Sequence, residues 1–152
     1  MKQQEGMKDS RGEYLNEPGW EHLHTVGQRW QSDMKFFADE VRFFYLLTDR
    51  LFGGLVMEER KERAAGLARD LETLDQERHG LNDRVDRHLN EIENIIQNPF
   101  PNDAQAAKNT HEALEVDVAA FVRNFKEVKR ELFLMAEEIM ESDKARRLLN
   151  KA

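Results

Sequence analysis

A heptad pattern in the middle of the chain is the feature that most constrains its fold. Between Ala64 and Ile95, seam residues recur at alternating steps of three and four for more than four heptads. This period places the seam residues on one face of an α-helix and is typical of coiled coils and helical bundles. Only Arg78 and His88 interrupt its apolar character. The seam consists of Ala64, Leu67, Leu71, Leu74, Arg78, Leu81, Val85, His88, Ile92 and Ile95.

Similar apolar spacing precedes and follows this segment, and two breaks separate the three stretches. Gly53-Gly54 forms the first break, because consecutive glycines weaken a helix and supply the left-handed conformation of a helix C-terminus. The second break is Asn98-Pro99-Phe100-Pro101-Asn102, where each proline lacks an amide donor. The sequence therefore predicts helices over about 20–52, 56–97 and 103–147.

We expect one domain over residues 19–152, preceded by a polar, flexible tail over residues 1–18. Two short connections force neighbouring helices to run antiparallel. The predicted fold is thus all-α, with three long antiparallel helices in a coiled-coil-like up-down-up bundle. The chain resembles spectrin-type repeats in its length, its three-helix periodicity and Trp30 in the first helix. Such repeats occur in tandem, and we do not assign the chain to that family.

Composition argues against several classes of function. The formal net charge is −7 and the isoelectric point is near 5.3, without a basic stripe, so we expect no nucleic acid partner. The chain has no cysteine, which excludes disulfides and thiolate metal sites and fits a cytoplasmic location. The first residues contain no secretory signal. The apolar stretch over residues 36–57 carries five charged residues, so we expect no transmembrane segment.

No catalytic motif is present. The glycines make no phosphate-binding pattern, and the chain has neither a glycine-framed serine nor a Walker-type lysine. Carboxylates are abundant, but pairs such as Glu59 with Arg63 have the spacing of solvated ion pairs on a helix face. The sequence therefore predicts a protein that is not an enzyme and needs no cofactor.

Folding the helices back through two short turns predicts which residues face one another. Trp30 should lie opposite Arg78, and His88 should lie opposite His111. The Arg78 guanidinium could then stack on the indole of Trp30. The alternative, which we favour, is that Arg78 lays its stem on the core and places its head in water.

The same folding brings four of the five histidines to the end of the rod opposite Gly53-Gly54. These are His22, His24, His88 and His111. With nearby glutamates they could bind a divalent metal such as Zn or Fe. However, the sequence has neither the Glu-x-x-His motif of diiron bundles nor His-Glu-x-x-His. A metal site is thus the alternative hypothesis, and structural or surface histidines are the preferred interpretation.

The first and third helices carry more apolar residues than one seam requires. By the predicted register this surplus surface lies near the Gly53-Gly54 end. Because an apolar patch of this kind is a liability on a monomer, we expect two copies to associate through it. The predicted interface residues are Phe36, Phe43, Leu47, Phe133, Leu134 and Met140. The alternatives are that the core absorbs the surplus, with the N-terminal segment as a fourth helix, or that the Phe-rich helix contacts a membrane surface, which the acidic charge disfavours.

The leading hypothesis is a non-enzymatic structural or interaction module that forms a homodimer or binds another helical protein. The rival hypothesis is a metal-binding bundle that uses the histidine-rich end.

Overall fold

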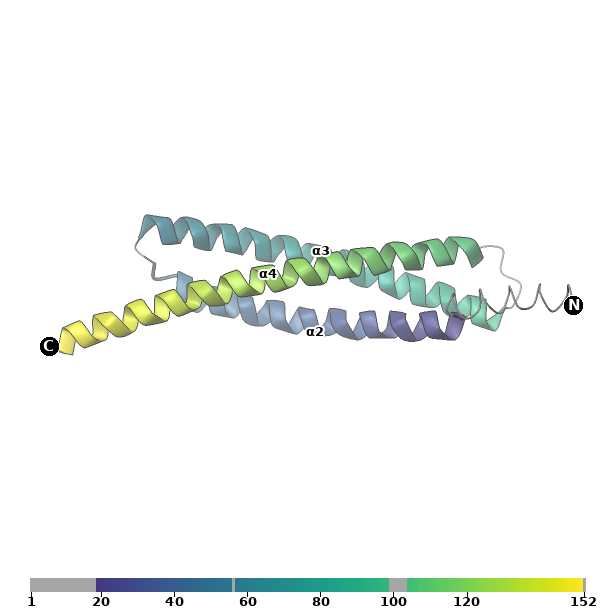
Figure 1. Ribbon diagram of the computed structural model, residues 1–152, viewed down its shortest axis with the longest axis horizontal. Coiled ribbons are helices and arrows are strands. Elements are labelled where there is room, and N and C mark those ends of the chain that lie inside the picture. The colour runs from purple at the N-terminus through teal and green to yellow at the C-terminus, as the bar shows by residue number, and fades with distance from the viewer. Residues whose placement is uncertain (1–18, 56, 99–103, 152) are drawn as a thin grey trace, which may run out of the picture.

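A computed structural model describes residues 19–55, 57–98 and 104–151, and within these ranges the chain forms three helices and no strand. They are α2 (Trp20–Phe52), α3 (Glu58–Gln97) and α4 (Ala104–Lys151). α3 runs antiparallel to the other two, and α4 crosses them at a shallow angle (Figure 1). The prediction of an all-α, up-down-up bundle is confirmed. The expected tail over residues 1–18 and the Pro99–Pro101 break lie outside the described residues.

The turn after α2 differs from the prediction in its backbone conformation. α2 ends at Phe52, but Gly53 has φ −62° and ψ −26°, and no glycine in the described ranges has a positive φ. The expected left-handed glycine was therefore wrong. A Cβ atom on Gly53 would lie 3.1 Å from the Asp49 carbonyl oxygen, so this position is crowded for another residue. α3 then starts at Glu58, two residues later than expected, with acidic side chains in its first turn that suit the helix dipole.

The remaining helix ends follow from local chemistry. α3 ends at Gln97, and Asn98 is extended at φ −119° and ψ 101°, the conformation favoured before a proline. α4 continues to Lys151, beyond the predicted end near Arg147. The segment after Arg147 contains no glycine or proline and includes leucines and a lysine, which favour a helix.

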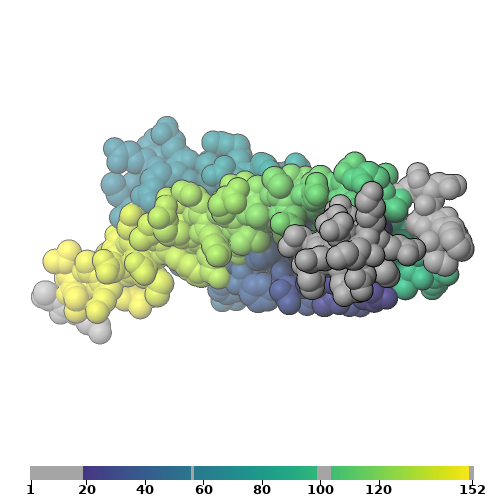
Figure 2. All heavy atoms as spheres, turned by 45° about the vertical axis from the view of Figure 1, so that its right-hand side comes forward, coloured from purple at the N-terminus to yellow at the C-terminus, as the bar shows by residue number. Residues whose placement is uncertain are grey.

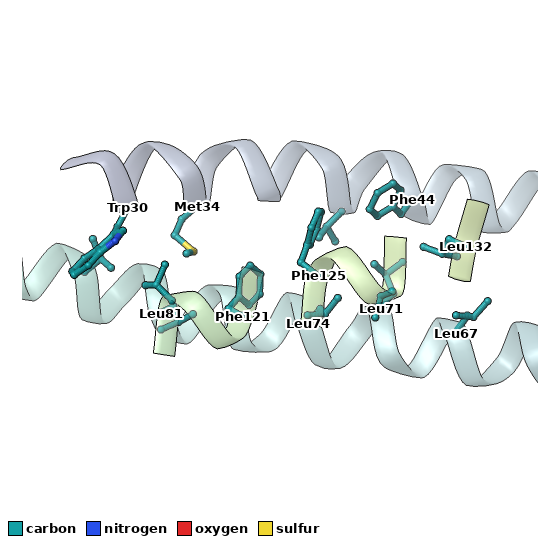
Figure 3. Packing of buried hydrophobic residues seen from close by; sticks show 14 of the residues in the cluster. Trp30, Met34, Phe44, Leu67, Leu71, Leu74, Leu81, Phe121, Phe125 and Leu132 are labelled. Atoms are coloured by element: carbon teal, nitrogen blue, oxygen red, sulfur yellow. The ribbon is translucent and has the colours of Figure 1, made fainter. Parts of the chain in front are cut away.

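All three helices contribute to one elongated hydrophobic core (Figure 3). Phe44, Leu71 and Leu132, one from each helix, are almost completely buried. The ring of Phe37 packs against Phe121 and Phe125, at centroid distances of 5.3 and 4.6 Å. Burying side chains of this size is worth about 1.5 to 3 kcal/mol each, so the core supplies most of the driving force for folding.

Ion pairs show that α3 and α4 keep the predicted register over most of their length. Arg84 pairs with Asp117 at 2.7 Å, and Arg63 pairs with Glu138 at 2.8 Å. In both pairs the residue numbers add to the same value, 201, as antiparallel helices in constant register require.

The register between α2 and α3 differs from the prediction. Gln31 donates a hydrogen bond of 2.8 Å to Asp86, so Trp30 lies well beyond the level of Arg78. The cause is that α3 starts beyond the end of α2, so the connection is not a symmetric turn (Figure 1). The two helices approach closely at Gly27, where an added Cβ atom would lie only 2.7 Å from Leu89 Cδ2.

Neither predicted environment describes Arg78 fully. Its guanidinium donates two hydrogen bonds to Asp75 Oδ1, at 3.0 and 2.8 Å, and its side chain is only 11% exposed. Trp30 instead stacks on His111, with ring centroids 4.7 Å apart. The shifted register explains why Trp30 does not lie opposite Arg78.

Candidate functional site

The outer side of α2 carries an apolar stripe near the Gly53-Gly54 end. Phe36, Phe43 and Leu47 recur at steps of seven and four, which places them on one side of the helix. This side points away from the core: Phe36 is 57% exposed and Phe43 is 52% exposed, whereas Leu47 is half-buried. The stripe therefore has no partner among the described residues that could bury it.

A row of aromatic rings joins this stripe to α4. Phe43 lies 5.9 Å from the buried ring of Phe44, and Phe44 lies 5.9 Å from Phe133 on α4 in an edge-to-face arrangement. Phe133 is 39% exposed. We call Phe36, Phe43, Leu47 and Phe133 together the apolar patch. It spans two helices, so its shape is fixed by the packing of the core beneath it.

The other two predicted interface residues occupy different places on α4. Met140 follows Phe133 by seven residues and thus lies on the same side of the helix, with 62% of its surface exposed. Leu134 is 46% exposed, but it is one residue from Phe133 and so points about 100° away around the helix. The structure therefore groups Met140 with the patch and separates Leu134 from it.

Charged side chains border the apolar patch. Lys129 donates a hydrogen bond of 2.9 Å to Glu40, and the resulting ion pair links α4 to α2. The Lys129 ammonium also lies 6.0 Å from the centroid of the Phe133 ring. An apolar centre with a polar border is the usual composition of a protein interface.

The last part of α4 projects beyond the other two helices (Figures 1 and 2). Every residue from Asp143 to Asn150 is exposed, and Leu148 and Leu149 are 62% and 77% exposed. A hollow of about 320 Å³ lies at the base of this projection, where Arg50, Leu55 and Arg146 contribute to its lining. The sequence pattern did not predict the projection, because we expected α4 to end near Arg147.

The opposite end of the rod contains a buried pair of histidines. His88 on α3 and His111 on α4 are 1% and 6% exposed, and their Nε2 and Nδ1 atoms lie 2.9 Å apart. This contact agrees with the prediction that they face each other. One ring must donate and the other accept, which requires that they not both be charged. Trp30 covers His111 from α2, and His88 Nδ1 has no hydrogen-bond partner within the described ranges.

Burial determines the protonation of this pair. Desolvation, together with a smaller contribution from the charge of His111, lowers the pKa of His88 to about 4. Desolvation also lowers the pKa of His111; His22 on α2 adds to this effect, while Glu115 and Glu112 on α4 oppose it. Both imidazoles are therefore neutral at neutral pH.

The other two candidate metal ligands do not join this pair in a binding site. His24 makes a contact of 3.0 Å with Glu93 across α2 and α3, and His22 is close enough to His111 to influence its charge. Across residues 19–55, 57–98 and 104–151, no group of three or more His, Asp or Glu side chains is placed to hold a metal ion. The four histidines thus lie toward one end of the rod, but within these ranges they do not form a set of metal ligands.

Two features of the site were missed but had signals in the sequence. Gly27 follows Leu23 by four residues and precedes Trp30 by three, so it lies on the buried face of α2, where a glycine indicates close helix approach. The charges near the end of α4 also change sign abruptly after Asp143. Both the glycine on the buried face and the change of charge can be read from the sequence alone.

None of the three helices, as far as the structure describes them, has a stretch both long and apolar enough to span a bilayer. Comparison with protein-family models, curated proteins and solved structures found no match to this chain.

Proposed function

We propose that this protein is a non-enzymatic interaction module that associates with a second copy of itself through the apolar patch. The observation that carries this proposal is the outward orientation of Phe36 and Phe43 on α2, each more than half exposed. Exposed aromatic side chains of this kind mark protein-protein contacts. A self-complementary patch used by both copies gives a closed two-fold dimer.

The proposal also covers the partners and the cellular location of this module. A chain with net charge −7 repels phosphate backbones, which supports the expectation of no nucleic acid partner. A cysteine-free sequence is compatible with a reducing cytoplasm, where we place the protein. Another helical protein could occupy the same patch, and the experiment below separates this case from self-association.

The test is the molar mass of the purified protein by multi-angle light scattering, measured over a range of concentrations. The expected mass is twice the chain mass of 17.9 kDa. Phe43→Glu places a charge in the patch without disturbing the core and should shift the protein to the monomer. Val116→Glu is the matched control, because Val116 is 66% exposed but lies on α4 far from the patch.

Circular dichroism should show the same helical content for both variants and the unaltered chain. A dimer that resists Phe43→Glu would contradict the use of this patch. A monomer at every concentration would overturn self-association and leave another protein as the occupant of the patch.

A further inference from the structure

The projecting end of α4 combines exposed apolar residues with a sharp division of charge. Residues 137–143 contain four carboxylates and no cation, whereas residues 144–151 contain four cations and no carboxylate. Cations at a helix C-terminus complement its dipole, which accounts for part of the second block. The helix dipole does not account for the acidic block directly before these cations, or for the exposed leucines.

The arrangement of residues on α4 gives the projection a defined contact side. Phe133, Glu137, Met140, Lys144 and Leu148 follow one another at steps of four, three, four and four, so they lie along one side of the helix. All five are exposed. Phe133 belongs to the apolar patch, so this contact side continues directly from the patch to the free end of the helix.

We infer that two copies of this chain join by antiparallel pairing of their α4 ends, about a two-fold axis between Met140 and Glu141. This inference rests on the proposed self-association and specifies its geometry. Antiparallel pairing places Glu137 opposite the partner subunit's Lys144 and Phe133 opposite the partner subunit's Leu148. Parallel pairing would place acidic residues against acidic residues and basic residues against basic residues.

This arrangement also explains how the projection can cover the Phe133 end of the apolar patch. α2 ends at Phe52 and α3 begins at Glu58, so neither of these helices lies beside the last turns of α4 (Figure 1). The partner's projecting end fills that space, and its Leu148 reaches the exposed ring of Phe133. Two copies of each contact form, as a two-fold interface requires.

Charge reversal tests the pairing directly. Glu137→Lys and Lys144→Glu each create two like-charge contacts in the dimer and should weaken it about tenfold, since two altered pairs of roughly 0.5–1 kcal/mol each are involved. Glu137 and Lys144 are both exposed, so neither change touches the core. An equimolar mixture of the two variants restores both opposite-charge contacts and should form a heterodimer. Lys126→Glu is the matched control, with the same charge change on α4 outside the pairing segment.

A second measurement uses the absence of cysteine from the chain. Met140→Cys introduces a single thiol beside the proposed axis, where oxidation should join two copies by a disulfide. Val116→Cys should give little such product.

The possible outcomes are distinct. Weakening by each single variant, rescue in the mixture and a disulfide at position 140 support the pairing. A dimer that is insensitive to both charge reversals overturns the pairing but leaves the proposed function standing. A chain that is monomeric before any substitution overturns both.

Discussion

Acidification should destabilise the bundle through its buried histidine pair. In the folded protein, burial and His111 lower the pKa of His88 to about 4, whereas an unfolded histidine has a pKa near 6.5. The unfolded chain therefore binds a proton at a higher pH than the folded chain. The stability contributed by the neutral ring is complete above about pH 6.5 and is lost as the pH falls toward about 4.

The size of the effect follows from the two pKa values. Between about pH 7.5 and about pH 5, most unfolded histidine becomes protonated while folded His88 remains mostly neutral. The free energy of unfolding should fall by about 2 kcal/mol over this interval from His88 alone. His111, whose pKa burial also lowers, adds to the loss in the same direction.

Urea denaturation followed by circular dichroism measures this loss at each pH. His88→Gln should flatten the pH dependence, whereas His79→Gln should leave it unchanged because the His79 side chain is 68% exposed. Nuclear magnetic resonance titration of the imidazole protons gives the pKa of His88 independently. A value near 6.5, or an equal loss of stability in His88→Gln, would refute the reasoning.

Two further predictions concern the packing of the helices, and urea denaturation checks both. Gly80→Ala should raise the free energy of unfolding by about 0.5 to 1 kcal/mol, because the site is open and alanine favours a helix. Gly27→Ala should lower it by about 1 to 3 kcal/mol, because the added Cβ meets Leu89; equal gains at both sites would contradict the close approach. Leu71→Ala should cost about 2 to 5 kcal/mol, because Leu71 is fully buried. Leu46→Ala, at a position 58% exposed, should cost less than about 0.5 kcal/mol, and a similar cost at both leucines would argue against this core.

Periodicity predicted which side of each helix faces the core, because burial of one apolar face decides that orientation regardless of the details of the turns. Every apolar residue in the predicted seam of α3 is buried. The contact between His88 and His111 was also predictable, since the break around Pro99 leaves little freedom in how α3 meets α4.

Periodicity could not predict how far α2 is shifted along α3. A shift by whole heptads still places one apolar seam against the other. The residues near the Gly53-Gly54 turn therefore decide the offset, and their sequence allows more than one. For this reason the predicted placement of Trp30 opposite Arg78 was wrong. Leu134 and Phe133, both predicted as interface residues, point about 100° apart, because neighbouring residues on a helix point in different directions. The interface residues themselves stay predictions.

The length of α4 has a consequence at the scale of an assembly. The helix continues without a break for 48 residues, roughly 72 Å at 1.5 Å per residue. From Ala104 to Met140 it covers roughly 54 Å. A two-fold axis between Met140 and Glu141 would thus hold the two histidine-rich ends at opposite poles, roughly 110 Å apart. In such a dimer the chain would serve as a stiff spacer, with the distance between its poles set by the number of residues in one helix.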